Sequence, residues 1–394
     1  MRVLIINSVC GHGSTGKICS DIAQQMIRQG HECTVAYGRD GNVPEHLSQH
    51  SYRIGTDFEV KLHGLKTRLL DAHGFGSTNA TKRFVSWIKD YNPDVIHLHN
   101  LHGYYIDVEV LFDFLKSFGK PVIWTLHDCW AFTGHCAYFT AAKCEKWKDK
   151  CKDCPSEKEY PATCLLESAE RNFERKKRAF TGVEKMRIVV PSDWLKRLVG
   201  ESFLRDYPVT VIRNGIDTEL FSSTESKLRE KYGIGNSRLI LGVASVWDGR
   251  KGLQDMVGLS AMLGEEYKTV LIGLSSKQIE ALPPNIIGIS RTENQKELAM
   301  WYSAADLFVN PTHEDNYPTV NLEAQACGTP AITYDIGGSG ESVPAGNVVT
   351  NGETAADLYE RICRGQFEIK AKNELSNEQM CKQYLELYLN ELEL

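Results

Sequence analysis

Short apolar runs rich in β-branched residues alternate with longer amphipathic stretches along the chain, and this alternation restricts the fold more than any other feature. Such runs are typical of strands buried on both faces of a parallel sheet, each followed by a crossover helix. The sequence therefore predicts an α/β protein. The first series of predicted strands covers residues 3–6, 33–37, 95–98, 122–126 and 188–190.

A second series of the same kind begins after residue 205. Between the two series, the Asn214-Gly215-Ile216-Asp217 turn follows a short strand, and we interpret residues 208–221 as the connection between two domains. The predicted domains are 1–205 and 206–373, and residues 374–394 form a closing helix that packs back on the first domain. In parallel sheets ligands bind beyond the carboxyl ends of the strands, so the expected site is a cleft between the domains. The second series covers residues 238–246, 269–272, 286–289, 307–310 and 331–334.

Composition and charge exclude several classes of protein. Hydrophobic residues make up 42% and charged residues 24% of the chain, which is ordinary globular usage. The formal net charge of −6 gives no reason to expect nucleic acid as the partner. The first apolar run is too short for a signal-peptide core, and no window approaches the roughly 20 apolar residues of a spanning helix. We therefore expect a cytoplasmic protein whose cysteines are reduced.

A glycine loop follows the first predicted strand. Residues 11–17 (GHGSTGK) match most of the phosphate-binding pattern G-x-x-x-x-G-K-[ST], but Ile18 replaces the hydroxyl that would ligate Mg²⁺. NTPase chemistry is therefore not expected. Two interpretations remain: a tight glycine turn that starts the first helix, or a loop in which Gly13 and Gly16 let the backbone approach a bound anion or sugar.

Two carboxylates stand out in residues 311–330 (PTHEDNYPTVNLEAQACGTP), which are expected to form a loop, a helix beginning near Pro318 and a turn. Asp315 and Glu323 are eight positions apart, so along a helix they would be separated by about 12 Å. That is too far for the acid and nucleophile of a retaining glycosidase, which lie about 5 to 5.5 Å apart. The pair is better suited to holding opposite ends of an elongated polar ligand whose phosphates lie at the helix start.

This motif resembles that of the retaining glycosyltransferases of family 4, which have the GT-B fold. The family has an acidic residue, seven intervening positions, Glu and then Ala-x-Ala-Cys-Gly-x-Pro, matched here by Asp315, Glu323 and residues 324–330. Glu314 stands one position too early, and we keep it as a substitute for Asp315. The resemblance implies that Asp315 binds donor-sugar hydroxyls and that Glu323 binds the nucleotide ribose. The donor site that it implies also takes in Asn316, Thr319 and Val320.

Two further segments match the family in the expected order. Arg250 and Lys251, followed by glycine, resemble the basic pair that binds the donor diphosphate. The arginine that usually follows the preceding strand is missing, since Ala244 and Ser245 stand there, so either Arg250 replaces it or the diphosphate is bound in a different way. Residues 337–341 (GGSGE) resemble the family's Gly-Gly-x-x-Glu loop, which places Gly338 near the donor.

In the first domain, His127 ends the strand predicted over residues 122–126. The resemblance places such a histidine in the cleft, in contact with the donor sugar or the acceptor. On this basis the predicted catalytic residues are His127, Arg250, Lys251 and Asp315.

The resemblance implies a specific fold and reaction. The fold is GT-B, with two facing Rossmann-like domains of parallel sheets and an interdomain cleft. The enzyme would move a sugar from a UDP- or GDP-sugar to a hydroxyl of a lipid-linked saccharide, with retention of configuration, in bacterial surface polysaccharide assembly. No metal or other cofactor is needed for that chemistry. The alternatives are a nucleotide-sugar epimerase of the same fold and a non-catalytic, zinc-bearing binding protein.

Six of the twelve cysteines fall between Cys129 and Cys164, in a segment that we interpret as an insertion. Cys151 and Cys154 have the C-x-x-C spacing of a metal chelate, and Cys136 and Cys144 could complete a closed tetrahedral zinc site. The segment resembles the cysteine-rich run of family members that assemble bacterial polysaccharides. Structural zinc is the favoured interpretation, and unliganded thiols are the alternative.

Two basic segments cover residues 61–70 (KLHGLKTRLL) and 171–178 (RNFERKKR). They fit two interpretations: solvated helices that pack on the core, or peripheral contact with anionic lipid at the inner membrane face.

Overall fold

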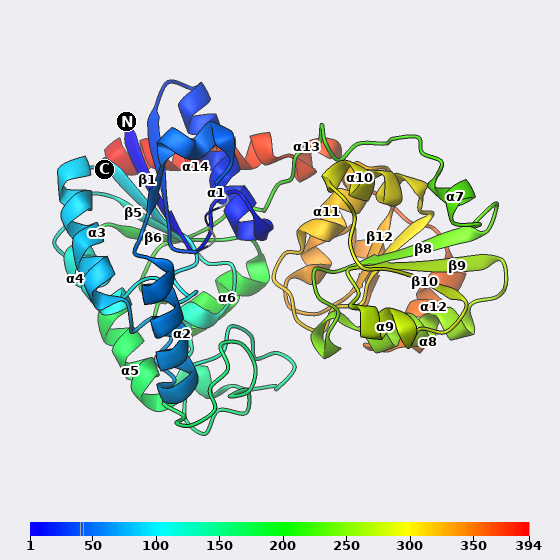
Figure 1. Ribbon diagram of the computed structural model, residues 1–394, viewed down its shortest axis with the longest axis horizontal. Coiled ribbons are helices and arrows are strands. Elements are labelled where there is room, and N and C mark those ends of the chain that lie inside the picture. Colours follow the sequence, from blue (N-terminus) through cyan, green and yellow to red (C-terminus); the bar gives the residue numbers. More distant parts are fainter. Residues whose placement is uncertain (40, 42, 394) are drawn as a thin grey trace. The chain divides into compact units, whose positions relative to one another are not determined.

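The computed structural model describes residues 1–39, 41 and 43–393. The chain divides into two compact units (Figure 1). Unit 1 holds residues Met1–Arg213 together with those from Met380 on, and unit 2 is Asn214–Gln379. Each unit is described by itself.

The described part of unit 1 contains a sheet in which every paired strand is parallel to its neighbours. Strand β1 (Arg2–Asn7), in the interior of this sheet, is apolar on both faces, since residues 3–6 are all fully buried. The strands, in spatial order, are β3 (Ser51–Arg53), β2 (Glu32–Tyr37), β1 (Arg2–Asn7), β4 (Val95–Leu98), β5 (Val122–Thr125), β6 (Met186–Val190) and β7 (Val209–Val211).

Helices cover both faces of this sheet. Side chains of α1 and α14 share one core with residues of β1 and β2, while α3, α4, α5 and α6 contribute to the core on the opposite face. The helices of the unit are α1 (Gly13–Arg28), α2 (Asp57–Leu70), α3 (Thr78–Tyr91), α4 (Val108–Leu115), α5 (Ala169–Phe180), α6 (Asp193–Glu201) and α14 (Asn377–Glu393), with short 3₁₀ helices at Glu45–His50, Trp130–Phe132 and Lys146–Lys148.

The C-terminal helix α14 is tied to two strands of unit 1 by buried hydrogen bonds. The Tyr388 hydroxyl lies 2.6 Å from His97 Nδ1 on β4, and the Tyr384 hydroxyl lies 3.0 Å from Thr125 Oγ1 on β5. Figure 1 shows this red helix beside α1. Both tyrosines are buried, so the end of the chain completes the core of the N-terminal part.

Unit 2 has a second parallel sheet in its described residues, covered by α10 and α11 on one face and by α8 and α12 on the other. The strands, in spatial order, are β10 (Ile286–Ile289), β9 (Tyr267–Ile272), β8 (Arg238–Val243), β11 (Leu307–Asn310), β12 (Ala331–Tyr334) and β13 (Val348–Val349). The helices are α7 (Leu228–Lys231), α8 (Leu253–Met262), α9 (Ser276–Glu280), α10 (Gln295–Ala304), α11 (Thr319–Ala326), α12 (Ala355–Arg364) and α13 (Lys372–Leu375), with 3₁₀ helices at Gly249–Lys251, Ser339–Ser342 and Ala345–Asn347.

The unit boundaries differ from the predicted ends at residues 205 and 373 for a physical reason. Strand β7 pairs with β6, so residues up to Arg213 belong to unit 1. Leu375 is buried in the core of unit 2, and its carbonyl accepts a hydrogen bond from the Ile216 amide at 2.8 Å. The predicted closing helix is therefore two helices, α13 and α14, with α13 in unit 2; its last residue, Leu394, lies outside the described residues.

The strand predicted over residues 238–246 is shorter than expected. It ends at Val243, because Ala244 and the residues after it turn into the loop that leads to Gly249–Lys251. Strands β3 and β13, with three and two residues, were not predicted, since segments so short carry little periodicity.

The cysteine-rich insertion, residues 129–164, folds around aromatic side chains that join the core of unit 1. The rings of Phe139 and Trp147 stack with centroids 4.9 Å apart. Lys176 on α5 reaches into the insertion and donates to the carbonyls of Trp130 at 2.7 Å and Thr133 at 3.0 Å. These contacts order the insertion through packing and backbone hydrogen bonds.

No helix in the described part of the chain combines the length and the hydrophobicity that crossing a bilayer requires.

Candidate active site

Loops after three neighbouring strands of unit 2 gather most of the predicted donor-binding residues. Arg250 and Lys251 follow β8, Asp315 follows β11, and Gly338 follows β12. Strands β8 and β11 are neighbours although β9 and β10 come between them in sequence, so the strand order reverses here. A parallel sheet opens a binding crevice at such a switch point.

Lys251 and Asp315 form an ion pair. The Lys251 Nζ lies 2.5 Å from Asp315 Oδ2, and both side chains are largely buried. The neighbouring Arg250 donates from Nη1 to the carbonyl of Glu314 at 3.2 Å, and the Arg250 carbonyl accepts from the His313 amide at 2.8 Å. The loops after β8 and β11 are therefore fixed to each other, with two basic side chains at their junction.

The glycine loop after β12 packs directly on Asp315. Gly337 has φ +61°, and a Cβ atom at this position would lie 2.1 Å from the Asp315 carbonyl oxygen. The next amide, of Gly338, donates to the same carbonyl at 3.2 Å. Only glycine allows this approach, so the Gly-Gly pair holds Asp315 in place.

The positive end of α11 opens beside these residues. Helix α11 begins at Thr319 and Val320, no side chain caps its start, and its first turn contains no acidic residue. Asn316 is buried just before the helix, and its backbone amide donates to Asp315 Oδ1 at 2.9 Å. Backbone N–H groups at an uncapped helix start, four residues after the Asp315 that pairs with Lys251, are suited to binding a phosphate group.

Glu323 lies on α11, one turn beyond Thr319. Its Oε2 accepts a hydrogen bond from the Tyr302 hydroxyl at 2.9 Å. Burial raises the pKa of Glu323 to about 7, although hydrogen bonds from Tyr302 and Thr319 act in the opposite direction. Because α11 begins only at Thr319, Asp315 lies in the preceding loop, and the 12 Å spacing expected along one helix does not apply.

A buried chain of amide and hydroxyl groups supports α11 from behind. Asn310 Nδ2 on β11 donates to Asn321 Oδ1 at 2.9 Å, and Asn321 Nδ2 donates to Ser342 Oγ at 2.7 Å. These bonds link α11 to β11 and to the segment after the glycine loop, so the predicted donor residues sit on a rigid support.

His127 in unit 1 has a histidine neighbour. Its Nε2 lies 2.9 Å from Nδ1 of His99, which follows β4, and the two rings stack. Burial lowers the pKa of His127 to about 4 and lowers that of His99 well below its ordinary value. Both imidazoles are therefore neutral near pH 7, and one donates a hydrogen bond to the other.

A second polar group lies beside this pair at the same edge of the sheet. His102 Nε2 lies 2.8 Å from Asp128 Oδ2, and His102 Nδ1 lies 3.1 Å from the hydroxyl of Tyr160, which belongs to the insertion. Burial opposes ionisation of Asp128, but His102 and the Trp130 amide hold its pKa below the ordinary value. The insertion thus contributes a tyrosine to the strand ends where His127 lies.

The glycine loop after β1 is closed on itself. Gly13 is exposed at the first position of α1, whereas Gly16 is buried and its carbonyl accepts from the Gly11 amide at 3.1 Å. Lys17 forms an ion pair with Asp21 at 2.5 Å. The lysine of this P-loop-like segment is therefore held by the helix itself.

The chain matches the family described as Glycosyltransferase Family 4 over residues 16–220, and Glycosyl transferases group 1 over residues 237–365. The first match spans more than half of the chain. This protein belongs to glycosyltransferase family 4.

The glycosyltransferase is similar to WcaC of Escherichia coli K12, named as a colanic acid biosynthesis glycosyl transferase, with 24% identity over 99% of this chain and 100% of the relative. The fold is similar to that of a sucrose-phosphate synthase from Thermosynechococcus elongatus, with a TM-score of 0.70, 18% identity and coverage of 99% and 98% of the two chains. Anabaena Alr3699/HepE in complex with UDP-glucose matches with a TM-score of 0.63, 15% identity and coverage of 99% and 100%. These likenesses show that the glycosyltransferase has the GT-B fold.

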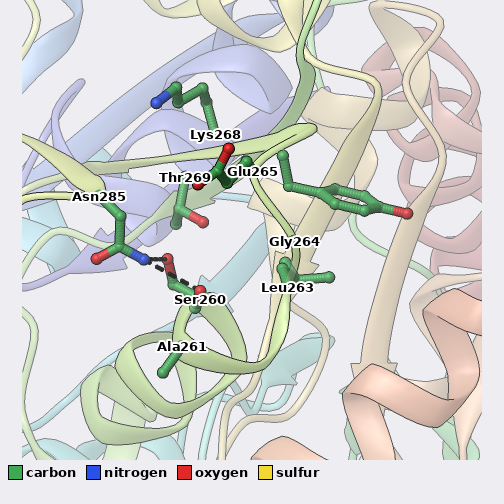
Figure 2. A pocket seen from close by; sticks show the side chains of 9 residues that line it. Ser260, Ala261, Leu263, Gly264, Glu265, Lys268, Thr269 and Asn285 are labelled. Atoms are coloured by element: carbon green, nitrogen blue, oxygen red, sulfur yellow. Dashed lines mark hydrogen bonds between the residues drawn. The ribbon is translucent and has the colours of Figure 1, made fainter.

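Figure 2 shows a pocket in unit 2 of the glycosyltransferase. It is lined by residues at the end of α8 and the start of β9, and by Asn285 directly before β10. Asn285 Nδ2 donates to Ser260 Oγ at 2.8 Å. This is the amino end of the sheet, opposite to the strand ends that carry Lys251 and Asp315. The pocket contains none of the predicted site residues.

All twelve cysteines of the glycosyltransferase lie among the described residues, and none of them forms a disulfide bond. Cys136 and Cys154 share a thiol hydrogen bond, and Cys151 Sγ accepts from the Gly134 amide at 3.2 Å. Within the described part of the chain, no group of three or more His, Cys, Asp and Glu side chains is gathered as metal ligands. Zinc binding by Cys136, Cys144, Cys151 and Cys154 stays a prediction.

Sequence reasoning missed several polar partners in this glycosyltransferase. His99 directly follows β4, which neighbours β5 and hence His127, so the rule that parallel strand ends meet at one edge could have identified it. Tyr302, which bonds Glu323, lies on a different helix and left no local signal. Tyr160 is 32 positions from Asp128 and approaches it only through the fold of the insertion, by way of His102.

Proposed function

We propose that this glycosyltransferase moves a sugar from a UDP- or GDP-sugar to a hydroxyl of a lipid-linked saccharide during bacterial surface polysaccharide assembly, with retention of anomeric configuration. The likeness to WcaC supports the polysaccharide role, and the likeness to the UDP-glucose complex of Alr3699/HepE supports a nucleotide-sugar donor.

The observation that carries the proposal is the grouping of Lys251, Asp315 and the start of α11 at neighbouring strand ends. A nucleotide diphosphate sugar needs cationic and N–H groups for its diphosphate and acceptors for its hydroxyls. Arg250, Lys251 and the first turn of α11 supply the former. Asp315 and Glu323 supply the acceptors for the hydroxyls, and Glu323 lies on α11 one turn beyond its start.

In this proposal the protein supplies orientation and charge and no nucleophile. Charge grows on the departing diphosphate, and Lys251 and the α11 N–H groups stabilise it. An oxygen of the departing diphosphate takes the proton of the acceptor hydroxyl. The bond from the sugar to the diphosphate breaks, and the bond from the sugar to the acceptor oxygen forms on the same face of the sugar. Neutral His127 donates or accepts a hydrogen bond at a sugar hydroxyl.

The test is a screen of UDP- and GDP-sugars by thermal shift, followed by turnover with a lipid-linked saccharide acceptor. Release of nucleoside diphosphate only when acceptor is present, with an NMR-assigned product of unchanged anomeric configuration, is the expected result. Product formation without acceptor would indicate an epimerase. Donor binding with neither product would indicate a binding protein, and an inverted product would remove the retaining mechanism.

We also propose that Cys136, Cys144, Cys151 and Cys154 bind one structural zinc ion. The contact between Cys136 and Cys154, and the position of Cys151 near Cys144 and Cys154, support this. Bound zinc would fix the insertion by joining thiolates from its separate turns. Metal analysis of the purified protein is expected to give close to one equivalent, and less than about half an equivalent would contradict the site.

A further inference from the structure

Helix α2 presents large apolar side chains to solvent. Phe58, Leu62, Leu65 and Leu69 follow one another at steps of four, three and four residues, which places them on one face of the helix. Phe58 is 73% exposed, and Leu62 and Leu65 are each 55% exposed. An isolated exposed leucine is ordinary, but four such side chains along one helix face are not.

The opposite, inward face of α2 carries Val60, which packs against the core, and two buried polar side chains. His63 and Thr67 are buried there; His63 Nδ1 lies 3.0 Å from Ser77 Oγ, and Thr67 Oγ1 donates to the His63 carbonyl at 3.0 Å. The largest apolar side chains of this helix therefore face solvent, whereas those of a solvated helix packed on a core face inward. Hydrogen bonds hold α2 to unit 1, and its apolar face stays available for another surface.

The segment that directly follows the insertion extends the apolar face. Leu165 is 68% exposed, and Leu166 beside it is also exposed. Their segment is fixed to the end of α2, because the Cys164 amide donates to the Arg68 carbonyl at 2.9 Å and the Leu166 amide donates to the Leu69 carbonyl at 3.2 Å. Figure 1 shows α2 ending beside the loops of the insertion. We call Phe58, Leu62, Leu65, Leu69, Leu165 and Leu166 the α2 ridge.

Cationic side chains flank the α2 ridge. Lys61, Lys66 and Arg68 are exposed, and the helical steps put Lys61 and Arg68 on one side of the ridge and Lys66 on the other. The two acidic residues of the helix are already paired, Asp57 with Arg53 and Glu59 with Arg83. An apolar strip bordered by positive charge is complementary to the acyl boundary and anionic headgroups of a phospholipid surface.

We propose that the α2 ridge is the surface by which this protein docks on an anionic phospholipid membrane, with the leucines and Phe58 entering the acyl boundary and the cations at the headgroups. A protein partner or a second copy of the chain would bury the apolar strip equally well, but the flanking positive charge favours lipid. The proposal deepens the proposed function, on which its purpose rests, because a lipid-linked acceptor lies in the surface that the ridge would bind.

The experiment is co-sedimentation of the full chain with vesicles of phosphatidylethanolamine and phosphatidylglycerol, and with vesicles of phosphatidylcholine alone. The L62S/L65S double variant is expected to lose about tenfold or more of its partition coefficient, because two leucines leave the bilayer. Neither side chain packs in the core, so the thermal midpoint should hold. The matched control is L389S/L392S, the same change at exposed leucines of α14.

A second variant separates charge from burial. K61Q/R68Q is expected to weaken binding to the phosphatidylglycerol vesicles by about tenfold, with little effect on phosphatidylcholine. The proposal would be overturned if the wild-type protein did not bind the vesicles, or if L62S/L65S bound them as strongly as the wild type. A wild-type dimer that L62S/L65S dissociates, without vesicle binding, would assign the ridge to a second copy instead. Sedimentation uses no donor or acceptor. Vesicle binding can therefore be absent while sugar transfer is observed, and sugar transfer can be absent while vesicle binding is observed.

Discussion

The ammonium of Lys251 lies 2.5 Å from the carboxylate of Asp315, although 64 residues separate them in the chain. The pair joins the loop after β8 to the loop after β11 at the point where the strand order reverses. In the proposed complex, Asp315 therefore has two tasks: it accepts from a sugar hydroxyl, and it holds the Lys251 charge where the donor diphosphate arrives.

Replacing Lys251 by Met is expected to lower kcat/KM for sugar transfer by about a hundredfold or more, because in the proposed reaction the charge of Lys251 stabilises the leaving diphosphate. Asp315→Asn should also lower it, by releasing Lys251 from its position. Steady-state release of nucleoside diphosphate measures both. Lys277→Met, at an exposed lysine of the same unit, is the control, and wild-type turnover in a folded Lys251→Met enzyme would refute the assignment.

The pH dependence of kcat/KM should report Glu323. Burial raises its pKa to about 7, so its carboxylate, which in the proposed complex accepts hydrogen bonds from the ribose hydroxyls, forms only as the pH rises through that value. We expect kcat/KM to increase through about pH 7 and the step to vanish in Glu323→Gln. Tyr302→Phe removes a hydrogen bond to this carboxylate and should move the step to higher pH. An unmoved profile in both variants would exclude Glu323 as its source.

Gly337→Ala should destabilise unit 2 and impair donor binding together. A methyl group there would lie 2.1 Å from the Asp315 carbonyl oxygen, so the loop would have to shift. Gly328→Ala is the matched control, because its φ is also positive, +88°, but its methyl group would meet open space. The control should lose only about 1 to 2 kcal/mol of its free energy of unfolding, which is the cost of placing a residue with a Cβ atom at positive φ. Urea unfolding and donor titration measure the two effects, and equal losses would contradict the close approach.

Unit 1 is expected to lose stability in mild acid. Burial lowers the pKa of His63 to about 4 and that of His97 to about 3, from an ordinary value of 6.5. Between these lowered pKa values and 6.5, the unfolded chain binds more protons than the folded chain. The free energy of unfolding is therefore highest above about pH 6.5 and falls as the pH drops toward the pKa values of the folded protein.

Each of these two imidazoles should lower the free energy of unfolding by about 2 kcal/mol between pH 6.5 and pH 5. Urea unfolding at the two pH values measures the loss, and His63→Asn should reduce it. Replacing the exposed His46 by Gln should leave the dependence unchanged. A free energy of unfolding that is constant over this interval would contradict the burial of neutral histidines.

The local pattern of the sequence was enough for the class of fold and for the ends of most strands. Runs such as residues 3–6 are apolar throughout, and only burial on both faces of a sheet removes such a run from water. The resemblance to the family 4 motif identified Asp315, Glu323 and the glycine pair, because that motif is a short run of neighbouring residues. These features depend on neighbours in the chain, which a sequence displays directly.

The tertiary structure decided what those residues touch. The ion pair between Lys251 and Asp315, the contact of His99 with His127 and the hydrogen bond from Tyr302 to Glu323 each join different strands or helices. The outward direction of Leu62 and Leu65 was decided in the same way, because leucines at helical spacing fit a core as well as a solvent face. Distances between elements, and the desolvation that shifts a pKa, arise only when the elements pack. The sequence by itself therefore determined which residues stand at the strand ends, and packing determined their partners and charge.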